Sequence, residues 1–178
     1  MSSFKITFLF ALTFSMTACG FRPLYVPSSE NAGIQGVYAF DKLQRVAISN
    51  IPDREGQYLR NALVRLLHPN GRRGKTLYIL NISLTEGTSS LAIQRSAEAT
   101  RTNLTVSGSF NLKSLIAGDQ LHSDVVTSTS GYNIFQSEFQ TLMAEKGARK
   151  RALDDLAQQI RIRLASHLTN SHSKVLRQ

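Results

Sequence analysis

The sequence has a single cysteine, Cys19, and only four histidines among its 178 residues. One cysteine excludes an intrachain disulfide framework and any zinc or iron–sulfur site built from several thiolates. The histidines are separated by predicted strands or lie near the polar C-terminal end, and we interpret each as a surface or capping side chain (His68, His122, His167, His172). The sequence therefore predicts no metal site and no cofactor.

Motifs of the common enzyme classes are also missing. The sequence contains no HExxH, GxSxG, GxGxxG, CxxC or P-loop pattern, and those spacings are fixed by the geometry of each mechanism. Asp154 and Asp155 are adjacent on a predicted helix, where neighbouring side chains point to different sides and cannot act as a carboxylate pair. We therefore expect no catalytic residues and a protein that is not an enzyme.

A long hydrophobic run is absent. Residues 6–16 form an apolar run of eleven residues, whereas a helix that spans a bilayer needs about 20. Lys5 precedes this run, and the small residues Thr17 and Ala18 follow it. This layout predicts a secretory signal peptide over residues 1–18 that is removed from the mature protein.

The cysteine lies where cleavage is expected. The segment Met-Thr-Ala-Cys at 16–19 is similar to a bacterial lipobox, which predicts that Cys19 becomes the first residue and carries a diacylglycerol and an acylated amine. Several acyl chains hold a protein at a membrane, since each buried CH₂ contributes about 0.8 kcal/mol. The residue after the cysteine is Gly20 and not Asp, which resembles the pattern in lipoproteins that are sorted to the outer membrane. The alternative is a buried or free thiol in a mature N-terminal strand.

Acidic residues are scarce: 12 Asp and Glu stand against 21 Lys and Arg, which gives a net charge of +9. Residues 146–178 hold eight of the basic residues and two acids. A basic surface attracts anions such as nucleic acid or phospholipid, but nucleic acid is disfavoured for a secreted, lipid-anchored chain without a recognition helix. The basic residues are either a solvated helix face or a site for phosphate groups on an amphiphile.

Hydropathy patterns predict one α+β domain over residues 43–168. It follows a lipidated tether at 19–42 and precedes a flexible polar tail at 169–178. The expected strands cover 43–51, 76–85 with a bulge near Gly87, 101–113 and 121–132, with a hairpin tip at 95–98. One expected helix starts at Asp53 as N-cap and ends before Pro69, and the other runs from about 144 to 168. The order β-α-β-β-β-α predicts a four-stranded, mostly antiparallel sheet with both helices on one face.

Three segments of the chain carry a recognisable pattern: Cys-Gly-Phe-Arg-Pro-Leu-Tyr at 19–25, Ser-Glu-Phe at 137–139 and the basic helix segment at 144–157. Together they resemble the LptE family of lipopolysaccharide-assembly lipoproteins in its alphaproteobacterial form. The resemblance covers essentially the whole mature chain. It implies a non-enzymatic outer-membrane lipoprotein, facing the periplasm, that plugs the lumen of the β-barrel translocon LptD in a one-to-one complex. It also implies a role in assembling that barrel and binding of lipopolysaccharide during insertion into the outer leaflet.

By position, the resemblance implies that Arg95 and Lys146 bind lipopolysaccharide, each through a charge-assisted contact to phosphate. The Ser, Thr and Asn residues on the predicted strand faces are consistent with the polar interior of a transmembrane barrel. Two alternatives stay open. One is a lipoprotein accessory or pilot of another envelope secretion machine, and the other is a lipid-anchored hydrolase with an unrecognised site.

Overall fold

The computed structural model describes residues 40–69, 71, 74–90 and 101–175, with side chains as far as residue 169. A short helical turn covers residues 40–44. The elements that follow confirm the predicted α+β class and its order: β1 (Val46–Ile48), α3 (Asp53–Leu67), β2 (Tyr78–Ser90), β3 (Arg101–Ser114), β4 (Gln120–Asn133) and α4 (Glu138–Val175).

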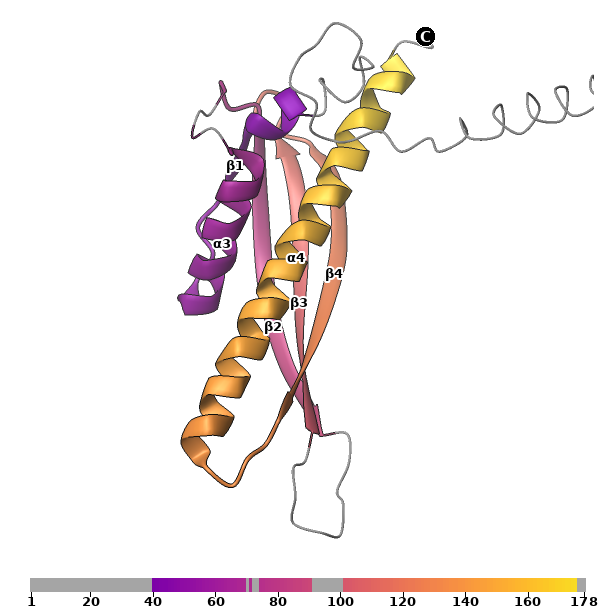
Figure 1. Ribbon diagram of the computed structural model, residues 1–178. Helices are drawn as coiled ribbons and strands as arrows, with labels where there is room; N and C mark the ends of the chain where they lie inside the picture. Colours follow the sequence, from indigo (N-terminus) through magenta and orange to yellow (C-terminus); the bar gives the residue numbers. More distant parts are fainter. Residues whose placement is uncertain (1–39, 70, 72–73, 91–100, 176–178) are drawn as a thin grey trace, which may run out of the picture.

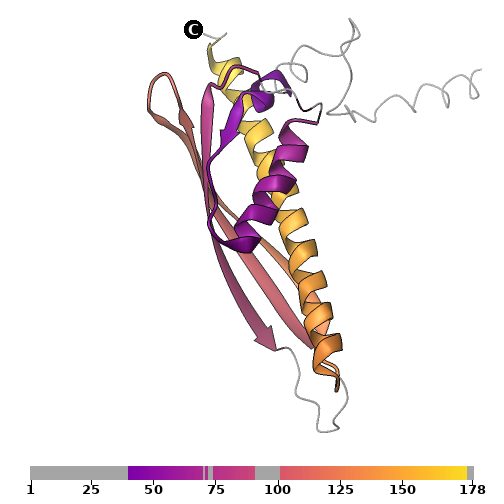
Figure 2. The same cartoon turned by 90° about the vertical axis from the view of Figure 1, so that its left-hand side faces the viewer.

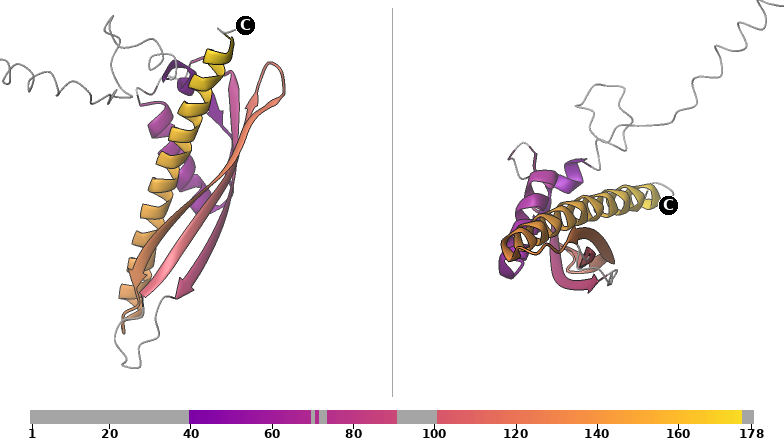
Figure 3. Two further views of the ribbon diagram at one scale, coloured as in Figure 1. Left: turned by 90° about the vertical axis from the view of Figure 1, so that its right-hand side faces the viewer. Right: turned by 60° about the horizontal axis from the view of Figure 1, so that its bottom comes forward.

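The four strands form one sheet in the order β1-β2-β3-β4. β1 pairs with β2 in parallel, while β2, β3 and β4 form an antiparallel meander. The three long strands run along most of the molecule, with α4 crossing over them (Figure 1). Figure 3 shows α3 and α4 together on the same face of the sheet, and they contact each other there.

Alternation along β3 explains which face the helices cover. Its inward residues Leu104, Val106, Phe110 and Leu112 are buried, while its outward neighbours are polar. At Gly108, in the same inward row, a Cβ would lie 3.1 Å from Leu156 Cδ2 of α4. The missing side chain therefore lets α4 approach the centre of the sheet closely. The rest of the core comes from the apolar stripes of both helices (Leu59, Leu63, Leu67, Ile160, Leu164).

The strands differ from the sequence expectation in the position of their irregularity and in the length of β1. The predicted bulge near Gly87 is wrong, because β2 pairs with β3 without a register shift as far as Ser90. Exposed Ser, Thr and Gly residues replace the apolar alternation there, since this end of the strand carries little of the core. The register shift lies instead between β3 and β4, at Leu112 and Lys113. β1 is also shorter than predicted. The tip at 95–98 lies outside the described residues.

The helix starts also differ. α3 begins at Asp53 after Pro52 and has no side-chain capping hydrogen bond, so the predicted Asp53 cap is wrong. The φ of Asp53 is 65°, a left-handed conformation that Asp tolerates better than most residues. α4 begins at Glu138, earlier than predicted. The sequence pattern does not indicate this start, because the apolar side chains of the first turns are exposed and form no stripe that faces the core. Its backbone also continues to Val175, through most of the segment expected to be a flexible tail.

Candidate functional site

A hollow lies between the first turns of α3 and the N-terminal half of α4. α4 contributes Lys146, Arg149, Lys150 and Leu153, and α3 contributes Arg54, Glu55 and Tyr58. Residues three and four apart face the same side of a helix, which is why these positions line one surface. We call this surface the basic hollow. It combines several cationic groups with the apolar side chain of Leu153.

Of the three predicted functional residues, the structure places only Lys146. Its side chain is exposed at the basic hollow, and it forms no ion pair within the described part of the chain. Cys19 and Arg95 lie outside the described residues. The ends of β2 and β3 that flank Arg95 in the chain lie at the same end of the molecule as the start of α4 (Figure 1).

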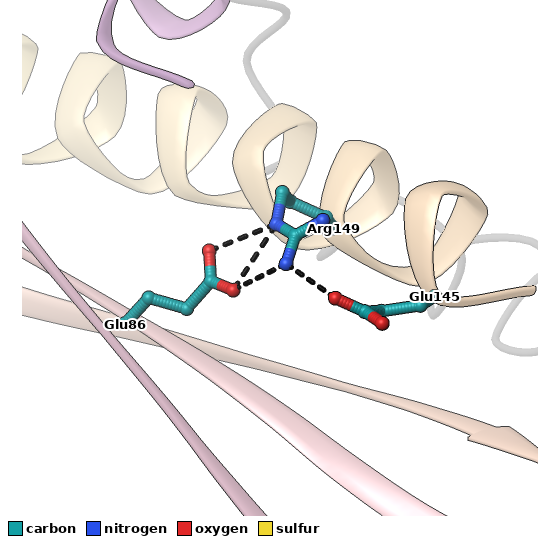
Figure 4. Close-up of polar contacts among 3 residues, drawn as sticks. All are labelled: Glu86, Glu145 and Arg149. Atoms are coloured by element: carbon teal, nitrogen blue, oxygen red, sulfur yellow. Dashed lines mark hydrogen bonds and ion pairs between the residues drawn. The ribbon is translucent and has the colours of Figure 1, made fainter. Parts of the chain in front are cut away.

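Arg149 lies beside Lys146 but has a different environment. Its Nε lies 3.0 and 3.1 Å from the two carboxylate oxygens of Glu86, and its Nη2 donates to Glu86 and to Glu145 at 2.6 Å each (Figure 4). The hydrogen bonds to Glu86 raise the pKa of Arg149 further above its ordinary value, so the guanidinium stays charged. Arg149 therefore fastens α4 to β2 and does not present a free charge.

The pairing of Glu86 with Arg149 was missed by the sequence analysis. Two weak signals were present. Glu86 continues the inward row of Leu80, Ile82 and Leu84 on β2 as a lone charge, and Glu145 precedes Arg149 by four residues, the spacing of a helix ion pair. Neither signal identifies the partner, because Glu86 and Arg149 are 63 residues apart in the chain.

Other polar side chains of α4 also fasten the helix to its neighbours. Arg151 donates to Ser130 Oγ and to the carbonyl of Gly131, at 3.3 Å each. Asp154 accepts a 2.9 Å bond from Tyr58 of α3, whereas Asp155 accepts a 2.7 Å bond from Ser128 of β4. The two adjacent carboxylates therefore point to different elements, as expected, and do not form an acid–base pair.

The histidines were predicted to be surface or capping residues. His68 is the C-cap of α3 and is buried. His122 of β4 is half-buried and stacks on His167 of α4 with ring centroids 4.5 Å apart, so these two are packing residues and not free surface groups. The side chain of His172 lies outside the described set. Among the described residues, no group of three or more His, Cys, Asp or Glu could hold a metal ion.

The face of the sheet opposite the helices is polar and almost uncharged. Between Arg101 and Lys113, the outward residues of β3 are Asn, Thr or Ser (Asn103, Thr105, Ser107, Ser109, Asn111). Several of them bond across strands: Thr105 to Thr129 at 3.0 Å, Ser107 to Thr127 at 3.1 Å and Asn111 to Asn81 at 3.1 Å. We call this surface the hydroxyl face. No helix in the described part of the chain is long and apolar enough to cross a bilayer.

Comparison with known proteins gives a consistent result. A crystal structure of a lipoprotein from Caulobacter crescentus matches with 22% identity and a TM-score of 0.59, over 73% of this chain and 95% of that one. A minor lipoprotein from Acinetobacter baumannii matches with 21% identity and a TM-score of 0.54, over 73% and 94%. Both likenesses support the fold alone, and no curated protein matches.

The sequence model of the family described as LptE, lipopolysaccharide-assembly, matches residues 43–164. This range begins just before β1 and ends within α4, so it includes every strand of the described sheet, all of α3 and most of α4. The match covers well over half of the chain, and the protein therefore belongs to the LptE family and has a role in lipopolysaccharide assembly.

Proposed function

We propose that this protein is a non-enzymatic, lipid-anchored subunit of the outer-membrane lipopolysaccharide translocon. In this role it plugs the lumen of the β-barrel LptD in a one-to-one complex and contacts lipopolysaccharide through the basic hollow. The observation that carries the proposal is the family match over residues 43–164, which spans the packed domain. Cys19 would carry the lipid that holds the protein at the outer membrane, facing the periplasm and the barrel lumen.

The hydroxyl face supports the placement inside a barrel. The interior of a large transmembrane barrel is polar, whereas its lipid-facing surface is apolar. Ser, Thr and Asn side chains can exchange hydrogen bonds with such a wall, and the near absence of charge means that docking does not require burial of unpaired ions. The cross-strand bonds of Thr105 and Ser107 already order part of this face before docking.

The basic hollow supports contact with a phosphorylated amphiphile. Lys146, Lys150 and Arg54 supply cations that form no ion pair within the described residues, and Leu153 with the ring of Tyr58 supplies apolar surface. Ammonium and guanidinium groups bind phosphate through charge-assisted hydrogen bonds. We include Arg95 in the same contact, because the strand ends on either side of it lie at the same end of the molecule as the start of α4.

Binding of purified lipopolysaccharide tests the role of Lys146. We expect Lys146→Asp to weaken binding about tenfold, which corresponds to about 1.4 kcal/mol, and the double variant with Arg95→Asp to weaken it further. Arg65→Asp is the matched control, since Arg65 is also exposed but lies in the last turn of α3 and does not line the basic hollow. Unchanged binding by a folded Lys146→Asp variant, or equal losses for both cations, would remove the basic hollow from the site.

A further inference from the structure

The turn that joins β3 to β4 exposes an unusual amount of apolar surface. Ile116 is 83% exposed, Leu115 is 52% exposed, and Leu121 at the start of β4 is 39% exposed. Turns are ordinarily built from Gly, Asn, Asp, Ser and Pro, whereas this one reads Leu-Ile-Ala-Gly. We call Leu115, Ile116 and Leu121 the apolar hairpin end.

Hydrogen bonds hold this turn in a fixed conformation. The amide of Leu115 donates to the carbonyl of Leu77 at 2.9 Å, which ties the turn to the segment before β2. The amide of Gly118 donates to Ser114 O at 3.0 Å, and the amide of Ser114 donates to Asp119 O at 2.9 Å. Gly118 has a φ of 74°, which a glycine adopts without strain. The exposed Ile116 is therefore presented by an ordered structure.

The apolar hairpin end lies at one end of the long molecule. Figure 2 and Figure 3 show the β3–β4 turn at the same end as the helical turn 40–44 and the C-terminal part of α4. The start of α4 lies at the opposite end (Figure 1). Phe40 follows Cys19 by 21 positions, a length that reaches at most about 70 Å. The chain thus leads from the proposed lipid to the end that carries the apolar surface.

Cations surround this end. Lys75 and Lys113 are exposed. Lys42 and Arg45 lie close by, because the carbonyl of Arg45 accepts the amide of Leu77 at 3.0 Å, but Arg45 forms an ion pair with Asp41 at 2.7 Å and Lys42 donates to Leu168 O at 3.1 Å. Asp41 and Asp119 are the acids near them. An apolar tip with flanking cations matches the interface of a bilayer, where acyl chains lie beneath phosphate headgroups.

We propose that the apolar hairpin end inserts Ile116 and Leu115 into the surface of a phospholipid bilayer that contains anionic headgroups. The inference rests on the proposed lipid anchor at Cys19, which brings this end to a membrane. Before the domain enters the barrel, insertion would give it a fixed orientation, with the β3–β4 end at the bilayer and the basic hollow further from it. The anchor alone does not fix this orientation, because a long tether permits many orientations of the domain relative to the bilayer.

The absence of tryptophan in the chain provides a direct test. Ile116→Trp places one fluorescent reporter on the apolar hairpin end, and Phe139→Trp places a matched reporter at the opposite end, where Phe139 is 70% exposed. Each lipidated full-length protein is reconstituted alone in vesicles of phosphatidylethanolamine and phosphatidylglycerol, with and without brominated acyl chains. We expect bromolipid quenching and a blue-shifted emission for Ile116→Trp but aqueous emission for Phe139→Trp. We also expect weaker quenching in vesicles without phosphatidylglycerol.

Flotation of the vesicles separates the two hypotheses. A protein that does not float lacks the anchor, which contradicts the proposed lipidation and the orientation derived from it. A protein that floats while both tryptophans remain aqueous, or while both are quenched equally, overturns the insertion proposal and leaves the anchor standing. Shielding of Ile116→Trp only after purified barrel protein is added would also overturn it, because the apolar hairpin end would then contact protein and not lipid.

Discussion

Arg149 and Lys146 are close together on one helix, and their different environments separate a structural cation from a binding cation. Arg149 has a side chain that is 22% exposed and is shared between two carboxylates. Lys146 is exposed and has no ion pair in the described part of the chain. Sequence alone cannot make this distinction, because both belong to the same basic run and the decisive partner, Glu86, lies on a distant strand.

The first prediction concerns Arg149. We expect Arg149→Met to lower the free energy of unfolding by about 1–2 kcal/mol, because Glu86 and Glu145 lose the partner that bridges them in a partly buried place. Arg149→Lys should lower the free energy of unfolding by a smaller amount, since lysine keeps the charge but not the bidentate geometry. Urea denaturation measures both. Lys150→Met is the control and should change stability by no more than about 0.5 kcal/mol. Equal effects at positions 149 and 150 would contradict the structural role of Arg149.

At the scale of the elements, the most predictable part is β3, where strict alternation of apolar and polar residues marks one covered face and one open face. The order of elements and the side on which the helices pack also follow from the patterns. The end of β2 and the first turns of α4 could not be predicted as well. Both lie away from the main core, so the apolar periodicity that marks an element is weak there. The exposed Phe139, Leu142 and Met143 show this most clearly.

The second prediction concerns the contact between α4 and the sheet. We expect Gly108→Val to destabilise the protein by about 2 kcal/mol, because even the first added carbon lies 3.1 Å from Leu156 Cδ2 in a filled core. Gly87→Val is the matched control, since nothing lies within 4 Å of a Cβ there. It should be neutral or slightly stabilising, because Val favours strands. Thermal and urea unfolding would measure both, and a neutral Gly108→Val would show that α4 packs less closely than described.

The third prediction concerns the link between the helices. Tyr58→Phe removes the bond to Asp154, and we expect a loss of about 1 kcal/mol at pH 8. Burial, followed by the bond to Asp154, raises the pKa of Tyr58 above its ordinary value of 10.0. The stability that this phenol contributes is therefore present below pH 10 and is lost as the pH rises through the raised pKa. Urea unfolding at pH 8 and pH 11 should show the difference between the two proteins shrinking, whereas a constant difference would contradict this role.

At the scale of the whole molecule, two ends with different chemistry are separated by the length of the long strands. The β3–β4 turn, with the exposed Leu115 and Ile116, and the helical turn 40–44 lie at one end, and the start of α4 lies at the other (Figure 2). The basic hollow is lined by α4 residues 146–153, near that second end. This polarity could not be predicted from the sequence. It depends on which segments meet in space, and Leu77 forms backbone hydrogen bonds with both Leu115 and Arg45.

The fourth prediction concerns the anchor. Cys19→Ala should leave the packed domain folded with an unchanged unfolding midpoint, because the core begins at Leu43, well beyond the lipidation site. In cells depleted of the barrel protein, the variant should, however, be lost from the outer-membrane fraction, since neither acyl chains nor the barrel hold it there. Cell fractionation and circular dichroism would measure the two properties. An unfolded variant, or one that stays in the membrane fraction, would contradict the assignment of residues 19–42 as a lipidated tether.

The composition of the complex that this protein forms in the outer membrane decides whether it is a subunit of a lipopolysaccharide translocon. The tagged full-length protein is purified from outer membranes in mild detergent, and native mass spectrometry gives the composition of the complex. We expect one large β-barrel protein at a one-to-one ratio, with lipopolysaccharide bound. A different ring-forming partner would indicate a pilot of another secretion machine, and recovery of the protein without any partner would contradict the proposed plug.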